Sequence, residues 1–396
     1  MAVLRRNEGQ MVAKTTTDIA VIVGEAVAKA VFPMPRLGSG CSSMAVRRDI
    51  TTLGPVELQR FIHVVREMHR RGWMDGFGSM HDHISHQVHG NDQFFAWHRR
   101  FLRHFEVLMQ EIDPDVVLPY WNWGTFWQNP LADPVLGAGY FGGNGRAGDN
   151  CVVDGAMARW GRNYPTRSCL TRKYRYGTTT GSFWPMRAVR DVMATSKSHA
   201  QFRSRIENGA HGIVHLGLGG DFETMWAPVD VLFFLHHATI DKIWAEWQSR
   251  DPQRFHEVDG YDAQRQPVTA RSIMPFYGDE VGTTLSTSGP GYCYVYDDVP
   301  GPPAFFKALN RRDTAADFYE PPNDIVAGDS SDDDASRRFA NETAPVADFT
   351  PPQPMDPKWL KSMNYDVKEA ARMQRLVNTV VAQINAERKE PPPRVK

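Results

Sequence analysis

Histidine is the residue type in this sequence best suited to chemistry, and it is concentrated in two segments. Eight of the 14 histidines lie between His63 and His104, and four more lie between His211 and His237. Imidazole is the commonest metal ligand in proteins and a frequent acid–base group. The clustering therefore predicts a metal or catalytic site assembled from two separated parts of the chain.

The second cluster has the spacing of a metal site on helices. His211 and His215 are four apart in HGIVH, so on a helix they project from one face and can hold one ion. Gly212 stands where a zinc protease of the HExxH type has glutamate, which excludes that class. His237 follows in VLFFLHHATIDKIW, whose apolar residues at helical spacing place it on a buried stripe. Asp241, four residues on, is placed to orient an imidazole or a nearby arginine.

The first cluster offers a comparable set. His98 lies in FFAWHRRFLRHFE, on the apolar face of a predicted helix. His89 is nine residues earlier and would point the opposite way on a continuous helix, so we expect it on a loop that folds back. The candidates for the third ligand are His81, His83 and His86.

The simplest interpretation of a single histidine on an apolar face is a hydrogen-bonded core residue, and it is kept for His63, His69, His199 and His256. Two triads within aromatic-rich helical sequence favour metal binding instead. Neutral, all-nitrogen triads without carboxylate or thiolate favour copper over magnesium, calcium or an iron–sulfur cluster. Zinc bound by three histidines is the main alternative.

Several elements must position these histidines. Residues 124–182 are rich in Gly, Asn and Arg and predict a long ordered loop. In the tail, Asp366 and Glu369 resemble a capping box that begins a helix over about residues 366–390. The apolar periodicity predicts the other helices over residues 45–72, from Phe94 to Asp113, from Ser198 to about His215, and from Leu232 to Trp247.

Composition limits the remaining choices. The 396 residues carry a formal charge of −1, which gives no basic field for nucleic acid or an anionic membrane. The apolar stretch 19–32 is interrupted by Glu25 and Lys29, so no clear signal peptide or membrane span is expected, and a soluble secreted or cytoplasmic location stays open. After about residue 298, repeated prolines and the run GDSSDDDAS predict a different, solvated segment.

Four stretches resemble the two copper-binding signatures of the tyrosinase family, which includes the catechol oxidases and has the haemocyanins as relatives. They are HGNDQFFAWHRRFLRHFE (89–106), LPYWNW (118–123), HGIVHLGLGG (211–220) and APVDVLFFLHHATIDKIWAEWQ (227–248). The resemblance implies a mainly α fold whose four-helix-bundle core holds a di-copper centre, with long ordered loops and a few short strands. We therefore expect an N-terminal tail (1–40), a copper-binding catalytic domain (41–298) and a Pro/Asp-rich C-terminal extension (299–396).

The resemblance also assigns the ligands. Copper A is expected on His81, His89 and His98, and copper B on His211, His215 and His237. His236 then becomes a neighbour that packs or hydrogen-bonds. Phe233 is a candidate for packing over the copper B side, and a plain core phenylalanine is the alternative.

Two departures from the family pattern bear on activity. Gln87 stands where some members have a cysteine linked to the second copper A ligand, so no thioether is expected. Gly212 stands where many tyrosinases have an asparagine proposed to help deprotonate a monophenol through a water held by an upstream glutamate, here Glu207. This departure argues against monophenol hydroxylation and leaves diphenol oxidation untouched.

The expected function is therefore a copper oxidoreductase that uses O2 to oxidise o-diphenols or o-aminophenols. The alternatives are a tyrosinase with monophenolase activity, a haemocyanin-like O2 carrier and a zinc protein. The expected partners are a small phenolic substrate and O2, without nucleic acid or membrane; the oligomeric state is not predicted.

Three further expectations concern the ends of the domain. GYCYVYDD (291–298) resembles the tyrosine motif that closes the family's core, against which Arg47 or Arg48 packs. Part of the tail, around Trp359, covers the copper site, or alternatively the tail wraps around and stabilises the core. For the cysteines we favour the pairs Cys151–Cys169 and Cys41–Cys293, with four free thiols as the alternative.

Overall fold

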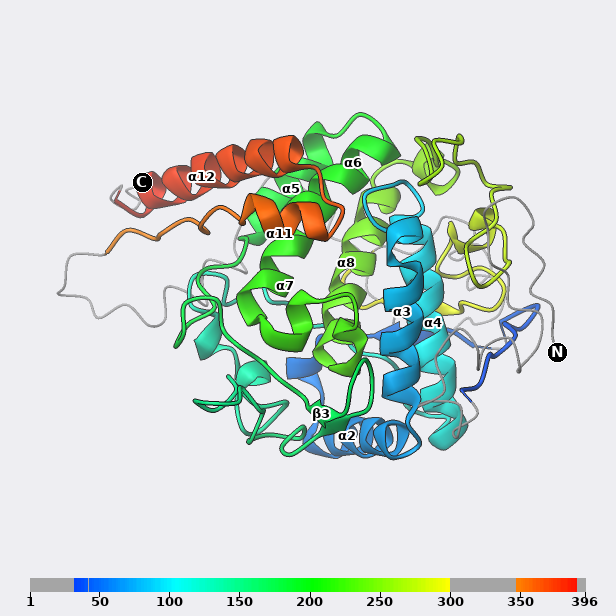
Figure 1. The fold of residues 1–396 in the computed structure, drawn as a ribbon. Coiled ribbons are helices and arrows are strands. Elements are labelled where there is room, and N and C mark those ends of the chain that lie inside the picture. Colours follow the sequence, from blue (N-terminus) through cyan, green and yellow to red (C-terminus); the bar gives the residue numbers. More distant parts are fainter. Residues whose placement is uncertain (1–31, 42, 300–346, 390–396) are drawn as a thin grey trace, which may run out of the picture.

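The computed structural model describes residues 32–41, 43–299 and 347–389 (Figure 1). Helices dominate this part of the chain, and the strands are short, as the expected fold class requires. None of its helices has the length and apolar character needed to cross a membrane.

The centre of the fold is made of helices that carry the clustered histidines: α3 (Trp73–Val88), α4 (Phe94–Ile112), α7 (Gly212–Leu218) and α8 (Leu232–Ser249). Helix α4 packs against α8, and α2 (Pro55–Arg70) packs across both α3 and α4 at one end (Figure 1). Nearly all of α8 is buried, and besides its apolar residues it buries polar ones, among them His237 and Asp241. The predicted four-helix core is thus present.

The expected helix over residues 45–72 is wrong in its first third. Residues 45–47 form strand β1 (Ala45–Arg47), the turn η1 (Ile50–Thr52) follows, and α2 begins only at Pro55. Proline is favoured in the first helical turn, and the Glu57 carboxylate accepts the N–H of Gly54 at 3.0 Å, which fixes the start there. At the other end Gly72, with φ +75°, ends the run and α3 begins after it.

The loop predicted over 124–182 is ordered and contains only short elements. Strand β2 (Gly161–Arg162) pairs antiparallel with β3 (Ser168–Cys169). Both favoured disulfides, Cys151–Cys169 and Cys41–Cys293, are present, so the free-thiol alternative is wrong. The loop also contains the short turns η2 (Pro130–Ala132) and η3 (Pro134–Leu136).

Other short elements follow the loop along the chain. They are α5 (Met186–Thr195), α6 (His199–Ile206), η4 (Glu207–His211), η5 (Gly220–Glu223), η6 (Ala227–Val229), η7 (Pro252–Phe255) and η8 (Val281–Thr284).

Two segments far apart along the chain, residues 45–47 and 294–296, meet at a strand pair. Strand β1 pairs in parallel with β4 (Tyr294–Tyr296). The side chain that packs on the tyrosine motif is that of Arg47: its guanidinium lies 3.5 Å from the ring centre of Tyr294 and donates to the Tyr296 hydroxyl. Arg48 instead forms an exposed ion pair with Glu57.

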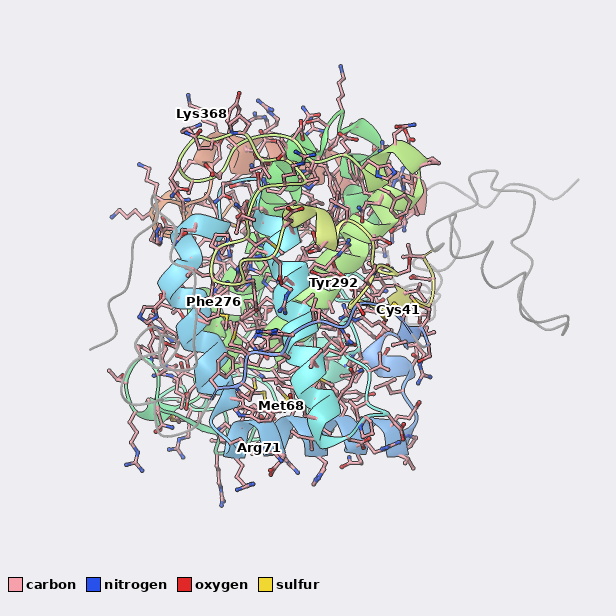
Figure 2. All side chains as sticks on the ribbon, turned by 90° about the vertical axis from the view of Figure 1, so that its right-hand side faces the viewer. Cys41, Met68, Arg71, Phe276, Tyr292 and Lys368 are labelled. Atoms are coloured by element: carbon pink, nitrogen blue, oxygen red, sulfur yellow. A yellow bond between two sulfur atoms is a disulfide. The ribbon has the colours of Figure 1, made fainter. Side chains whose placement is uncertain are left out.

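The C-terminal segment, defined here as residues 347–389, runs along one end of the molecule. It contains α11 (Pro357–Ser362) in addition to the expected helix, which is α12 (Val367–Lys389) and whose first turn is capped by the Asp366 carboxylate. The apolar stripe of α12 belongs to the same hydrophobic core as the central helices, and α12 packs on α5, α6 and η4. Figure 2 shows Lys368 of this segment at the end of the molecule opposite to Arg71, which follows α2.

Candidate metal centre

The first triad consists of His81, His89 and His98. His81 lies in the middle of α3, His89 immediately follows the last residue of that helix, and His98 lies in the first half of α4. A short turn between α3 and α4 reverses the chain and brings His89 back to His98, as expected for a loop that folds back. All three side chains are buried, and their candidate ligand atoms lie within 4.8 Å of one another.

The other two candidates for this triad point away from it. His83 and His86 are exposed on α3, and the His83 Nδ1 bonds to the carbonyl of Ser79 at 2.7 Å. His81 instead places its Nε2 3.3 Å from the Nε2 of His98. The geometry therefore brings His81, and not His83, to the site.

The second triad consists of His211, His215 and His237. His211 ends the π-helical turn η4, His215 lies one helical turn further in α7, and His237 lies in α8. The His237 Nε2 is 3.2 Å from the Nε2 of His211 and 3.4 Å from that of His215. Single π-helical turns are rare and frequently mark functional sites.

Hydrogen bonds fix the orientation of most of these imidazoles. In four of them Nδ1 donates to a backbone carbonyl, which leaves the unprotonated Nε2 free to bind a metal. The donor–acceptor pairs are His81 with Met225 O (2.5 Å), His89 with Ser85 O (3.1 Å), His98 with Phe94 O (2.8 Å) and His215 with Phe222 O (2.7 Å).

Burial keeps the triads neutral. Removal from water lowers the pKa of His89 to about 3 and that of His215 to about 4, and it lowers the pKa of His98 well below the ordinary value. Neutral imidazole is the form that binds a metal. The two triads face each other, since the rings of His98 and His237 stack with centroids 4.5 Å apart. This donor set fits two adjacent copper ions.

Phe233 packs against both triads. Its ring stacks on that of His237, with centroids 4.1 Å apart, and makes an edge contact with His81 at 5.1 Å. The Nδ1 of His237 has no hydrogen-bond partner among the described residues, so ring stacking by Phe233 and His98 is what orients His237. His236 is also buried and stacks on His211 at 5.3 Å, as a packing neighbour would.

Glu207 and Gly212 lie on the helical run that carries His211. The Glu207 carboxylate is buried; one oxygen accepts the N–H of Gly90 and the other accepts Arg203 Nη1, each at 2.8 Å. Burial raises the pKa of Glu207 to about 7, although the attraction of Arg203 opposes this shift. A Cβ atom at Gly212 would lie 3.0 Å from the ring of Tyr365, so the space beside it is filled.

Two residues of the C-terminal segment reach the triads, and no spacing or motif along the chain pointed to them. The Tyr365 hydroxyl lies 3.0 Å from the Nδ1 of His211, and the Asn364 amide donates to the backbone carbonyl of His89 at 2.8 Å. Trp359, the residue expected over the site, donates its indole N–H to the carbonyl of Glu223.

Asp241 binds arginine rather than histidine. Its carboxylate pairs with Arg99 and accepts the hydroxyls of Tyr294 and Tyr296, all of them buried. This network braces α4 against α8, one helical turn beyond His237.

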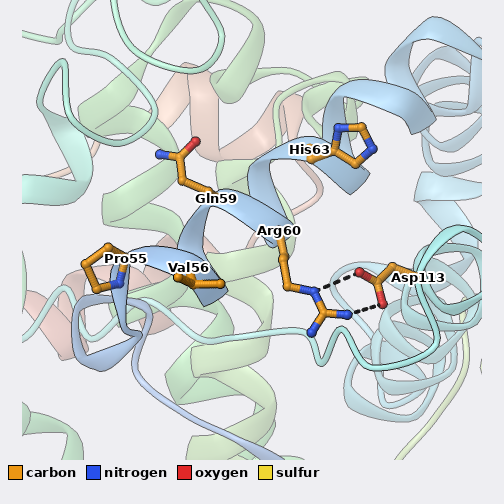
Figure 3. A pocket seen from close by; sticks show the side chains of 6 residues that line it. All are labelled: Pro55, Val56, Gln59, Arg60, His63 and Asp113. Carbon is orange, nitrogen blue, oxygen red and sulfur yellow. Dashed lines mark hydrogen bonds and ion pairs between the residues drawn. The ribbon is translucent and has the colours of Figure 1, made fainter.

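A surface pocket on α2 lies apart from the triads (Figure 3). Its lining includes Val56, His63 and an ion pair between Arg60 and Asp113, and it includes no member of either triad. His63 is exposed and takes no part in the metal centre.

The chain is similar to known proteins in sequence and in fold. The family model for the common central domain of tyrosinase matches residues 65–250. The tyrosinase of Streptomyces antibioticus is 34% identical over 236 residues, which cover 53% of this chain and 85% of that protein. Grixazone synthase of Streptomyces griseus subsp. griseus is 28% identical over 287 residues, covering 59% and 93%. A solved polyphenol oxidase variant from Thermothelomyces thermophila has the same fold, with a TM-score of 0.56 at 19% identity, covering 71% of this chain and 97% of that one.

Proposed function

This chain belongs to the tyrosinase family of type 3 copper oxidases, and from that premise we propose that it oxidises o-diphenols or o-aminophenols and hydroxylates monophenols poorly. In the diphenol reaction, two substrate molecules give up two electrons and two protons each, and O2 is reduced to two water molecules. Two copper ions supply the capacity to bind and reduce O2.

We assign the copper ions to the two triads. His81, His89 and His98 hold copper A, and His211, His215 and His237 hold copper B. The hydrogen bonds from Nδ1 and the burial of all six rings support this assignment, because they fix the tautomer and keep the imidazoles neutral before the metal arrives. Phe233 holds the His237 ring by stacking.

The observation that supports poor monophenol hydroxylation is the close packing of other side chains around Gly212. A side chain there would meet Tyr365 at 3.0 Å and the sulfur of Met355 at 3.1 Å, so an amide that orients a water has no room. Each oxygen of the buried Glu207 carboxylate already accepts one hydrogen bond, from Gly90 or from Arg203, so a water would have to compete for the remaining lone pairs.

The test is O2 uptake by the copper-loaded enzyme with tyrosine, a catechol and an o-aminophenol side by side. We expect fast uptake with the catechol or the o-aminophenol and slow uptake with tyrosine. Strong tyrosine hydroxylation without a lag would refute the interpretation of Gly212 and favour a true tyrosinase, the activity that the name of the Streptomyces antibioticus relative indicates. Reversible O2 binding without turnover would favour an oxygen carrier.

The role of the C-terminal segment is a separate part of this proposal. We favour a segment that wraps around and stabilises the core, because α12 contributes Met373, Val377 and Val380 to the main hydrophobic core. The alternative is a shield over the substrate entrance. Proteolytic trimming near residue 300 discriminates the two: a removable shield gives faster catechol turnover after cleavage, and a stabilising segment gives loss of activity.

A further inference from the structure

We propose that the C-terminal segment completes the metal centre, with the Tyr365 hydroxyl as the positioning group for His211. This inference rests on the proposed function, since it takes His211 as a copper ligand. It assigns to the segment a task that the core domain does not perform for itself.

Five of the six candidate ligands have a hydrogen-bond partner for Nδ1 among the described residues, and His211 is the one of these five whose partner is a side chain. His81, His89, His98 and His215 each direct Nδ1 to a backbone carbonyl of the central domain. His211 has the Tyr365 hydroxyl oxygen at 3.0 Å instead. With Nε2 committed to the metal, Nδ1 carries the proton and donates it to that oxygen. Both side chains are buried, so water does not compete for this bond.

Tyr365 is held in place by its neighbours along the chain. Asn364 adopts a left-handed backbone conformation, with φ +59°, at the corner between α11 and α12, and its amide donates to the carbonyl of His89. The backbone N–H of Asp366 donates to the side chain of Asn208 at 2.6 Å. The consecutive residues 364–366 therefore attach the C-terminal segment to His89 in the first triad, to His211 in the second, and to Asn208 beside it.

The core domain leaves room for this corner at two glycines, each directly after a candidate ligand. A Cβ atom at Gly90, next to His89, would lie 2.2 Å from the Asn364 carbonyl oxygen. A Cβ atom at Gly212, next to His211, would lie 3.0 Å from the Tyr365 ring. The two glycines thus permit the close approach that the hydrogen bonds require.

The experiment uses the full-length, copper-loaded chain and the variant Tyr365→Phe, which keeps the ring and removes only the hydroxyl. Groups that orient a metal-bound imidazole typically contribute about 10–100-fold to metal affinity. We therefore expect a copper chelator to remove the ion of the second triad from the variant at an about 10–100-fold lower chelator concentration than from the unmodified chain. The ion of the first triad is expected to stay bound. The remaining single copper(II) ion is then detected by electron paramagnetic resonance.

The matched control is Trp359→Phe. It removes a hydrogen bond from the same segment to the core, from the indole to the Glu223 carbonyl, without touching a candidate ligand. Phenylalanine is chosen because it keeps an aromatic ring against Tyr365, whose ring centroid lies 5.5 Å from that of Trp359. We expect this variant to retain both copper ions as the unmodified chain does, and denaturant unfolding of the copper-free proteins to show that both variants are folded.

Three results have distinct meanings. If Tyr365→Phe retains both ions with unchanged affinity, the positioning role is overturned. The same holds if Trp359→Phe loses copper equally, because docking of the segment would then be the cause. If the unmodified chain does not bind two copper ions, the proposed function itself fails.

Discussion

Replacing Glu207 by glutamine probes the buried link between the two triads. The guanidinium of Arg203 is shared between Glu207, at 2.8 Å, and Asp92, at 2.9 Å. Burial is the main reason that the pKa of Glu207 rises to about 7; the charge of Arg203 opposes the shift and that of Asp92 adds to it. Burial therefore outweighs the single charge of Arg203, which Asp92 shares, and Glu207 keeps its proton at mildly acidic pH.

The size of the effect follows from the shift. A rise from the ordinary 4.5 to about 7 corresponds to about 3 kcal/mol at ~1.4 kcal/mol per pKa unit. Because the folded-state pKa is the higher one, the folded protein retains a proton that the unfolded chain has released between these pH values. The stabilising contribution is therefore complete below pH 4.5 and lost as the pH rises to about 7.

The assay is denaturant unfolding of the copper-free protein, because bound cations would lower this pKa. Glutamine does not titrate, so the free energy of unfolding of the unmodified chain minus that of Glu207→Gln is expected to shrink by about 3 kcal/mol from pH 4.5 to above pH 7. A difference that stays constant over this range would refute the reasoning. A selective loss of tyrosine turnover in Glu207→Gln with unchanged catechol turnover would instead contradict the proposal on monophenols, because it would show that the carboxylate holds a catalytic water.

Further predictions concern single residues. Phe233→Leu removes the ring stacked on His237 and is expected to weaken copper retention by about 1 kcal/mol, about fivefold in chelator competition. Arg47→Met removes both guanidinium hydrogen bonds to the buried Glu106, which keeps Arg103 as a partner, and is expected to lower the free energy of unfolding by about 2–3 kcal/mol. Arg48→Met, in an exposed ion pair, serves as its control and should leave the denaturation midpoint unchanged. Gly212→Ala forces a tight contact with the C-terminal segment and is expected to cost about 1–3 kcal/mol, measured by denaturant unfolding.

The spacing of the histidines was enough to predict most of the metal centre. A separation of four residues places His211 and His215 on one helical face, and an apolar stripe buries His98 and His237. These are local relations that helix geometry enforces wherever the helix lies. The helix bounds were less certain, because a terminus depends on capping: α2 begins at Pro55 rather than at residue 45.

Residue spacing left His81, His83 and His86 open, and only the family resemblance favoured His81. All three lie on one helix, α3, and the direction in which each points is decided by how α3 packs against η6 and α2. Similarly, Arg47 rather than Arg48 faces the tyrosine motif because β1 pairs with β4 in one particular register.

The sequence by itself thus determined the class of site, because imidazole spacing and apolar periodicity are properties of neighbouring residues along the chain. The two disulfides that we favoured from the sequence are both present. The contact between Tyr365 and His211 joins residues 154 positions apart, and no local pattern encodes it. Only the docking of α12 on the central core brings the C-terminal segment to the second triad, since that placement is decided by the packing of whole helices.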